Sequence, residues 1–170
     1  MSKLTEVLDE ASTRLLRLNA PPVNLTGKVV IAYDENDLLD VLKGVRSYPA
    51  VGIVYEGMRS MSEGGPTARV GMSGEIVLGL VLVERGDEVH NTLQKKVRAI
   101  EYLDAMRFQF IGQRSTVTNH FWHFMVEAPA ALRSGAVCWV QRWSLPVQMV
   151  HSEGSPTTPP RHPFYDPACK

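Results

Sequence analysis

The sequence contains few cysteines, no excess charge and no long apolar run. Two cysteines among 170 residues, Cys138 and Cys169, are too few for a disulfide scaffold or a zinc site of four thiolates. The 18 Lys and Arg equal the 18 Asp and Glu, so any contact with nucleic acid or an anionic membrane would have to be local. The longest apolar run, residues 76–83, falls far short of the roughly 20 residues of a membrane helix. The sequence therefore predicts neither a membrane protein nor a general nucleic-acid binder.

The composition is that of a globular protein. Apolar residues make up 44% of the chain and charged residues 21%, which argues against general disorder, and the length fits one domain with or without a tail. Residues 1–19 carry charges throughout and lack the apolar stretch of a signal peptide, so we expect the protein to be made and folded inside the cell.

Three segments have the apolar spacing of amphipathic helices. The first covers 3–18 with Ser2 as its N-cap, and the second covers 35–46 behind the N-cap Asp34. The third and strongest covers 87–111 and is expected to pack on a sheet through a stripe of apolar residues at helical spacing. That stripe is Val89, Leu93, Val97, Ile100 and Leu103.

Five segments are predicted to be strands because they are rich in β-branched, aromatic or other apolar residues. They cover 28–33, 50–55, 75–84, 121–127 and 136–143, with a long loop bearing glycine and methionine at 57–74 and a connection at 128–135. Strands that follow each other directly predict hairpins, so we expect an α+β fold with a mostly antiparallel sheet and flanking helices. The strand at 75–84 is apolar on both faces, which requires a cover on each side of the sheet or a second subunit over one of them.

The C-terminal segment differs from the rest of the chain. Residues 151–170 hold five of the 11 prolines and almost no aliphatic residue, so they cannot form a core of their own. We predict an α+β domain over 1–150, followed by an extended, proline-rich tail over 151–170 that becomes ordered only when it binds a partner.

No arrangement of residues indicates catalysis or a metal site. His120 and His123 are expected in one strand, where residues three apart point to opposite faces and cannot share an ion. Cys138 lies in the middle of a predicted strand and is expected to be a buried apolar residue rather than a nucleophile. The paired acids at 34–37 and 87–88 stand at helix starts, where capping explains them. We therefore expect no enzyme, no cofactor and no metal.

The sequence has instead a surplus of apolar and aromatic residues that suits contacts between subunits. Methionine, aromatic residues and Arg are common at interfaces, and a proline-rich tail binds at a low entropic cost. Trp122, Trp139 and Trp143 fit this interpretation, and the alternative is that all three belong to the core. The residues predicted to contact partners are Met58, Arg59, Met61, Glu63 and Met72 in the loop and Phe164 and Tyr165 in the tail.

Several parts of the chain, taken in order, form a recognisable layout. They are the N-terminal helix with Pro21-Pro22, the strands at 48–55 and 74–85, the helix with Leu93, Val97, Ile100 and Leu103, and the closing strand region 137–149. Over residues 1–150 this layout resembles the tail terminator, or tail-completion, proteins of long-tailed bacteriophages. The resemblance lies in the order of the elements and in the distribution of apolar residues along them.

The resemblance implies a small α+β subunit of the virion that closes into a homohexameric ring on the head-proximal end of the tail tube. Such a ring stops tube polymerisation and joins the tail to the neck, and its subunits are made in the host cytoplasm. The implied partners are further copies of the chain, the tail tube protein, a neck or head-completion protein and, in a contractile tail, the sheath protein. DNA would only pass through the lumen.

Two alternatives stay open. A head–tail connector or neck subunit would have the same composition. A small ligand-binding or enzymatic α+β domain is a more distant alternative, and a deep pocket with convergent polar groups would favour it.

Overall fold

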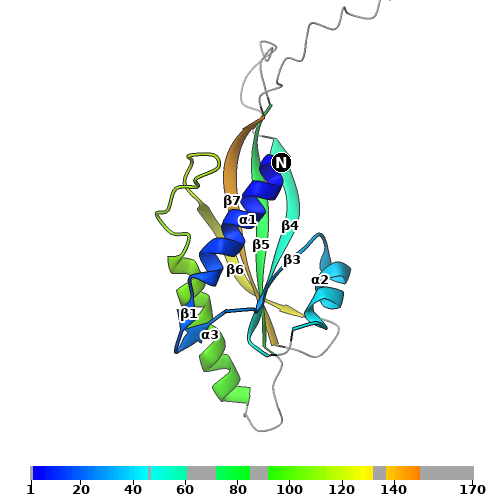
Figure 1. Ribbon diagram of the computed structural model, residues 1–170, viewed down its shortest axis with the longest axis vertical. Helices are drawn as coiled ribbons and strands as arrows, with labels where there is room; N and C mark the ends of the chain where they lie inside the picture. The colour runs from blue at the N-terminus through cyan, green and yellow to red at the C-terminus, as the bar shows by residue number, and fades with distance from the viewer. Residues whose placement is uncertain (1, 46, 61–71, 85–91, 132–136, 150–170) are drawn as a thin grey trace, which may run out of the picture.

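The computed structural model describes residues 2–45, 47–60, 72–84, 92–131 and 137–149. Within them the chain forms an α+β fold whose element order follows the prediction, with one small hairpin added after the first helix (Figure 1). The helices are α1 (Lys3–Leu16), α2 (Glu35–Leu42) and α3 (Thr92–Phe108). The strands are β1 (Asn19–Ala20), β2 (Val23–Asn24), β3 (Val29–Ala32), β4 (Ala50–Ser60), β5 (Met72–Glu84), β6 (His123–Ala131) and β7 (Val137–Met149).

Five of these strands form one mixed, mostly antiparallel sheet. Its order is β3-β4-β5-β7-β6, and only β3 and β4 run parallel to each other. Strand β5 is central, and its register with β7 runs from Met72 opposite Met149 to Glu84 opposite Val137. The predicted fold class is confirmed for this part of the chain, whereas the predicted tail at 151–170 lies outside the described residues.

Helices α1 and α2 begin where they were predicted to begin. The Ser2 Oγ accepts a hydrogen bond from the Thr5 backbone N–H at 3.2 Å, and the Asp34 Oδ1 accepts one from the Asp37 N–H at 2.9 Å. Each cap satisfies a backbone donor that the first helical turn would leave unpaired. Helix α2 ends at Leu42, before the predicted end at residue 46.

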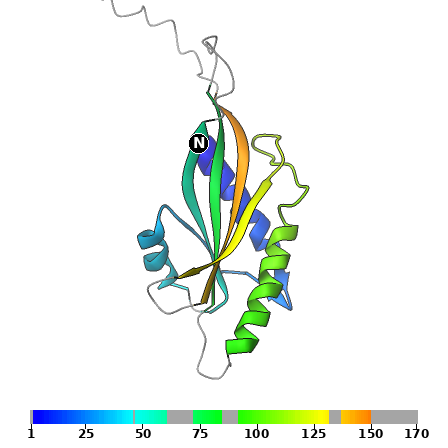
Figure 2. The same cartoon turned by 180° about the vertical axis from the view of Figure 1, so that it is seen from behind.

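Apolar side chains line both faces of the sheet, but helices cover the two faces to different extents. Helices α1 and α3 enclose the larger core on one face, while α2 covers only one end of the other face (Figures 1 and 2). Strand β5 contributes side chains to both cores, as its two apolar faces predicted. It gives Ile76, Leu78, Leu80 and Leu82 to the larger core. The smaller core consists of Ala32, Leu38, Leu42, Ala50, Val81, Val83 and Cys138.

Strands β4 and β5 extend beyond their predicted ends. Their pairing continues as far as Ser60 opposite Gly74, so the predicted loop at 57–74 is wrong at both of its ends. Gly57 does not begin a loop; it has a φ of +124° beside a bulge in β4, a conformation that glycine adopts without strain. The centre of the predicted loop, 61–71, lies outside the described residues.

Strands β6 and β7 are also longer than predicted. Strand β6 reaches Ala131 and β7 begins at Val137, so the predicted connection at 128–135 is too long. Pro129 stays in the ladder opposite Trp139 because β6 is an edge strand, where a residue without a backbone N–H is tolerated.

The tryptophans belong to the core rather than to an exposed surface. Trp143 is fully buried and Trp122 is 3% exposed, and Trp139 packs half-buried against the same core. The Phe110 ring joins the first two, with centroids 5.1 Å from Trp122 and 5.2 Å from Trp143. The alternative of a core role is therefore correct for Trp122 and Trp143, whereas Trp139 packs on the core with part of its side chain exposed.

Helix α3 turns a different face to the core than predicted. Of the predicted stripe, Leu103 is buried, but Val97 and Ile100 are exposed. Val89 lies outside the described residues, and the structure does not describe the side chain of Leu93. The buried residues of this segment are Ala99, Tyr102, Leu103, Met106 and, just after the helix, Phe110. They recur at spacings of three and four and so form the true inner face of α3.

Candidate assembly surface on helix α3

The outer face of α3 carries an apolar stripe. Val97, Ile100 and Phe108 are 51%, 53% and 75% exposed, and Ile111, just after the helix, is 49% exposed. The Ile111 backbone N–H still bonds to the Arg107 carbonyl oxygen at 3.0 Å, so it continues the helical turn. At about 100° per residue the four apolar side chains fall in one sector, opposite the inner face, and the exposed Asp104 lies between Ile100 and Phe108 in this sector. We call Val97, Ile100, Phe108 and Ile111 the outer stripe.

The outer stripe differs from the other exposed aromatic residues of the described chain. Tyr33 is a single exposed residue after β3, and Phe121 and Phe124 are partly exposed with cationic side chains over both rings. The guanidinium carbons of Arg114 and Arg107 are 4.7 Å and 5.7 Å from the respective ring centroids. Single exposed apolar residues are common in soluble proteins, whereas grouped ones mark interaction sites. The outer stripe is therefore the strongest candidate for a contact surface.

A groove borders the outer stripe. It is an open depression of about 540 Å³ between the segment 17–23, which links α1 to β2, and the outer side of α3. The Tyr102 hydroxyl holds the two walls together, since it accepts a hydrogen bond from the Asn24 backbone N–H at 3.2 Å. The groove is lined by Arg17, Leu18, Asn19, Ala20, Pro22, Val23, Glu101, Asp104, Ala105 and Phe108. Because Phe108 belongs to both features, the outer stripe and this α3 groove form one continuous surface.

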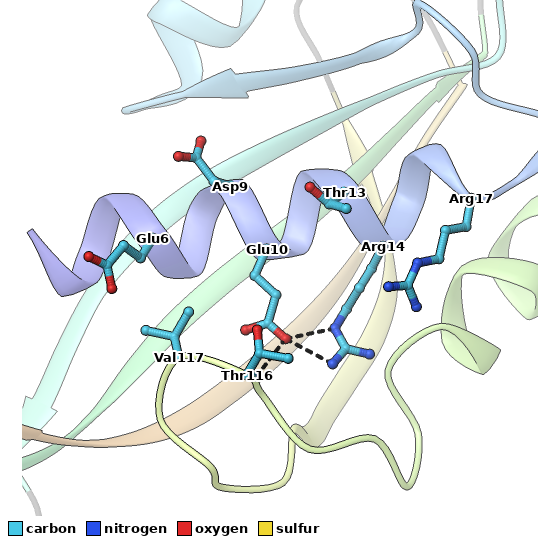
Figure 3. Close-up of a pocket in the computed structure, with 8 residues that line it drawn as sticks. All are labelled: Glu6, Asp9, Glu10, Thr13, Arg14, Arg17, Thr116 and Val117. Carbon is cyan, nitrogen blue, oxygen red and sulfur yellow. Dashed lines mark hydrogen bonds and ion pairs between the residues drawn. The ribbon is translucent and has the colours of Figure 1, made fainter. Parts of the chain in front are cut away.

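A second cavity, of about 330 Å³, lies beside α1 and is lined mainly by polar side chains (Figure 3). Its central group is the Glu10 carboxylate. One carboxylate oxygen accepts hydrogen bonds from Arg14 Nε at 3.0 Å, Arg14 Nη2 at 2.8 Å and the Thr116 N–H at 3.0 Å. The other accepts one from the Ser115 hydroxyl at 2.6 Å. The groups that converge on Glu10, which are Arg14, Ser115 and Thr116, are thus already bonded to it.

The Glu10–Arg14 pair is a buried structural tie. The two side chains are 8% and 7% exposed. Burial alone raises the pKa of Glu10, but the hydrogen bonds from Ser115, Arg14 and a backbone N–H outweigh it, so the pKa lies below its ordinary value. Arg14 also donates to the carbonyl oxygens of Gln109 and Arg114, at 3.2 Å and 2.6 Å. The pair therefore fixes the segment after α3 to α1.

A second polar network holds the inner side of α3 to the sheet. Arg107 Nη2 and Gln141 Nε2 each donate to the same Glu127 oxygen, both at 2.7 Å. Gln141 is fully buried and also donates to the Leu103 carbonyl oxygen at 2.8 Å. With the apolar inner face, these bonds fix the orientation of α3, so the outer stripe has a fixed direction too.

The predicted partner contacts in the loop are placed differently by the structure. Met58 and Arg59 lie on β4 and Met72 begins β5, so none of the three is in a loop. Met58 packs half-buried against the larger core, beside Gly74, where an added Cβ would lie 3.2 Å from the Met58 sulfur. Met58 is therefore a strand residue packed on the core, Arg59 is exposed, and the contacts of the three residues with partners stay predictions.

The other predicted contact residues cannot be placed. Met61, Glu63, Phe164 and Tyr165 lie outside the described residues, and their contacts with partners stay predictions.

The histidines and the described cysteine are not brought together. His120 precedes β6 and His123 begins it, so the two are not in one strand as predicted, and both are exposed. Cys138 is 2% exposed, in agreement with its predicted burial. Within the described ranges, no group of three or more His, Cys, Asp or Glu residues is placed to hold a metal ion.

None of the helices in the described part of the chain has both the length and the apolar character needed to cross a membrane. Comparison with known protein-family models and with curated proteins finds no match to the chain. The candidate surface is therefore interpreted from its own geometry.

Proposed function

We propose that the chain is a structural subunit of the tail terminator type, which associates with further copies into a ring on the head-proximal end of a bacteriophage tail tube. The observation that carries this proposal is the outer stripe of α3, whose four apolar side chains are 49–75% exposed on a helix that is buried on its opposite face. Covering them would contribute about 25 cal/mol for each Å² of apolar surface removed from water. A self-associating subunit provides such a cover.

The choice of family rests on the layout of the chain. The order of helices and strands over residues 3–149 is the feature on which the resemblance to tail terminators depends. The formal net charge of zero suits a ring that lets DNA pass without holding it, because each cation–phosphate contact would add affinity. In this role the ring would stop growth of the tube protein and offer its other side to a neck protein.

The cavity beside α1 bears on the alternative of a ligand-binding domain. Its polar groups converge, as that alternative requires, but Glu10 and Arg14 bond to each other and to the segment after α3. A ligand would have to replace these bonds, at a cost of the order of 1–3 kcal/mol for each buried group left unsatisfied. The assembly role therefore has the better support.

The proposal is tested by the mass of the full chain in solution. Mass photometry and negative-stain electron microscopy should show rings, and addition of these rings to the polymerising tail tube protein should shorten the tubes. A head–tail connector would form rings without limiting tube length. A full chain that is monomeric at micromolar concentration would contradict the proposal.

A pair of matched variants connects the rings to the outer stripe. The double substitution Val97→Ser and Ile100→Ser should abolish ring formation, because it removes half of the exposed apolar side chains. Tyr33→Ser is the control, since Tyr33 is 76% exposed but is not part of the stripe. Rings that survive the double substitution would exclude the outer stripe as the interface.

A further inference from the structure

The α3 groove is lined by apolar side chains and by charged side chains of opposite sign. Phe108 is 75% exposed and presents an aromatic ring to the groove, next to Leu18 and Ala105. Arg17 stands on the wall from α1, and Glu101 and Asp104 stand on the wall from α3. Asp104 already accepts a bond from Arg107 at 2.8 Å, but its side chain is still 54% exposed. The groove therefore suits a peptide with aromatic side chains between a cation and an anion.

One segment of this chain has that pattern. Residues 161–166 read Arg-His-Pro-Phe-Tyr-Asp, with two adjacent aromatic residues between Arg161 and Asp166. Pro163 restricts the backbone beside Phe164, which lowers the entropy lost on binding. Aromatic rings pack well on other rings and on proline, and both kinds of side chain line the groove.

We propose that the segment 161–166 of a neighbouring copy binds in the α3 groove. Phe164 and Tyr165 pack on Phe108 and on the other apolar side chains that line the groove. Arg161 lies toward Glu101 and Asp104, and Asp166 lies toward Arg17. The choice of a neighbouring copy rests on the proposed self-association. The match between the segment and the groove is independent of that proposal.

The chain after β7 is long enough for the segment to reach a groove. The Gln141 side chain bonds to the Leu103 carbonyl oxygen, so the middle of α3 is level with Gln141. From there to Met149, where the described chain ends, β7 rises roughly 26 Å, and Figure 1 shows this end far from α3 and β1. Residues 150–160 span up to about 40 Å when fully extended, so the segment 161–166 is within reach of a groove at this distance. The choice of a neighbouring copy therefore rests on the proposed self-association, and the second test below decides it.

The first test measures binding of the segment to the groove. A fluorescent peptide of residues 159–168 is titrated against the full chain carrying Phe164→Ala and Tyr165→Ala, whose own tail then competes less. We expect Phe108→Asp to weaken binding at least about tenfold, as loss of an interfacial aromatic anchor does, and Tyr33→Asp to leave it unchanged. Glu101→Arg should weaken binding too, and a peptide with Arg161→Glu should restore it. Equal binding to all of these proteins, or no binding, would overturn the proposal.

The second test uses the native tail thiol to decide between the same and a neighbouring copy. A chain with Asn19→Cys and Cys169→Ala, in which residue 19 lies on the groove wall, is mixed with the unmodified chain under mild oxidation. A disulfide between the two chains is expected. Lys43→Cys with Cys169→Ala is the control, because the Lys43 side chain is 71% exposed on a different element. A second variant carries Asn19→Cys and keeps Cys169. If a disulfide forms only within single chains of this variant, and none forms between chains, the choice of a neighbouring copy is overturned.

The two proposals can fail separately. If the peptide binds but the full chain stays monomeric, the proposed ring is wrong and the groove assignment stands. If rings form but Phe108→Asp leaves peptide binding unchanged, the ring stands and the groove assignment is wrong.

Discussion

The inner and the outer face of α3 are both apolar, yet they meet different surroundings. On the inner face, Tyr102 and Met106 are at most 4% exposed, and Phe110 continues this face into the cluster with Trp122 and Trp143. On the outer face, Phe108 is 75% exposed. The two phenylalanines are close in sequence, so local composition does not separate them. Their difference assigns the inner face to folding and leaves the outer face for the proposed association.

The largest effect is expected from Phe110→Ala on the inner side. The ring is fully buried between two tryptophans, and its removal leaves a cavity in the larger core. Truncation of a buried Phe costs about 3–5 kcal/mol of the free energy of unfolding. Urea denaturation of the full chain checks this value. A loss below about 1 kcal/mol, the scale of a surface substitution, would show that the inner face does not hold the fold.

A smaller loss is expected from Glu10→Gln, which breaks the tie between α1 and the segment after α3. The substitution leaves the buried Arg14 guanidinium without its charged partner, and removal of one member of a buried pair costs about 3 kcal/mol. Glu6→Gln is the control on the same helix, since Glu6 is exposed, and it should change the free energy of unfolding by less than about 0.5 kcal/mol. Equal effects of the two substitutions would refute the structural role of the pair.

The same carboxyl group predicts a pH dependence of stability. The pKa of Glu10 is lower in the folded protein than the ordinary value of 4.5. Its contribution is therefore complete above pH 4.5 and is lost as the pH falls through the lower, folded pKa. Urea midpoints measured between pH 3 and pH 7 should fall less steeply at the acid end for Glu10→Gln than for the unmodified chain. Parallel curves would contradict this assignment.

The smallest effect on stability is expected from Phe108→Ala on the outer face. At concentrations where the chain is monomeric, the free energy of unfolding should change by no more than about 0.5 kcal/mol, because the ring already contacts water. At higher concentration the substitution should lower the apparent stability, since it removes the gain from self-association. A loss of several kcal/mol in the monomer would place Phe108 in the core and remove the distinction between the two faces.

Much of the fold could be predicted from local patterns. The caps at Ser2 and Asp34 and the alternation in 76–83 have direct chemical causes, and they gave two helix starts and the two-sided central strand. The ends of the long strands could not be predicted. Gly57 resembles a loop residue in the sequence, but a bulge places it inside β4.

The candidate site could be predicted only in part, and α3 explains why. Its sequence has apolar residues at helical spacing on two opposite faces, so periodicity indicates a helix but does not say which face is buried. The choice of Val97 and Ile100 for the core was wrong because the opposite side of the helix, with Tyr102 and Met106, faces the larger core. The apolar residues on both sides of the helix were themselves a signal. A helix that is apolar on two sides must pack against something on each side, so one side had to face away from the core.

The position of the chain end relative to the α3 groove has a consequence for symmetry. Strand β7 ends at Met149, while the groove lies between the segment 17–23 and α3. A contact between the segment that follows Met149 and the groove of another copy joins two different surfaces, so it is either exchanged reciprocally within a twofold dimer or passed head to tail from copy to copy. Such a head-to-tail contact either closes after a fixed number of copies or continues as an open fibre. The rotation between successive copies, rather than the strength of the contact, would then decide whether the chain forms a closed cap or an unlimited polymer.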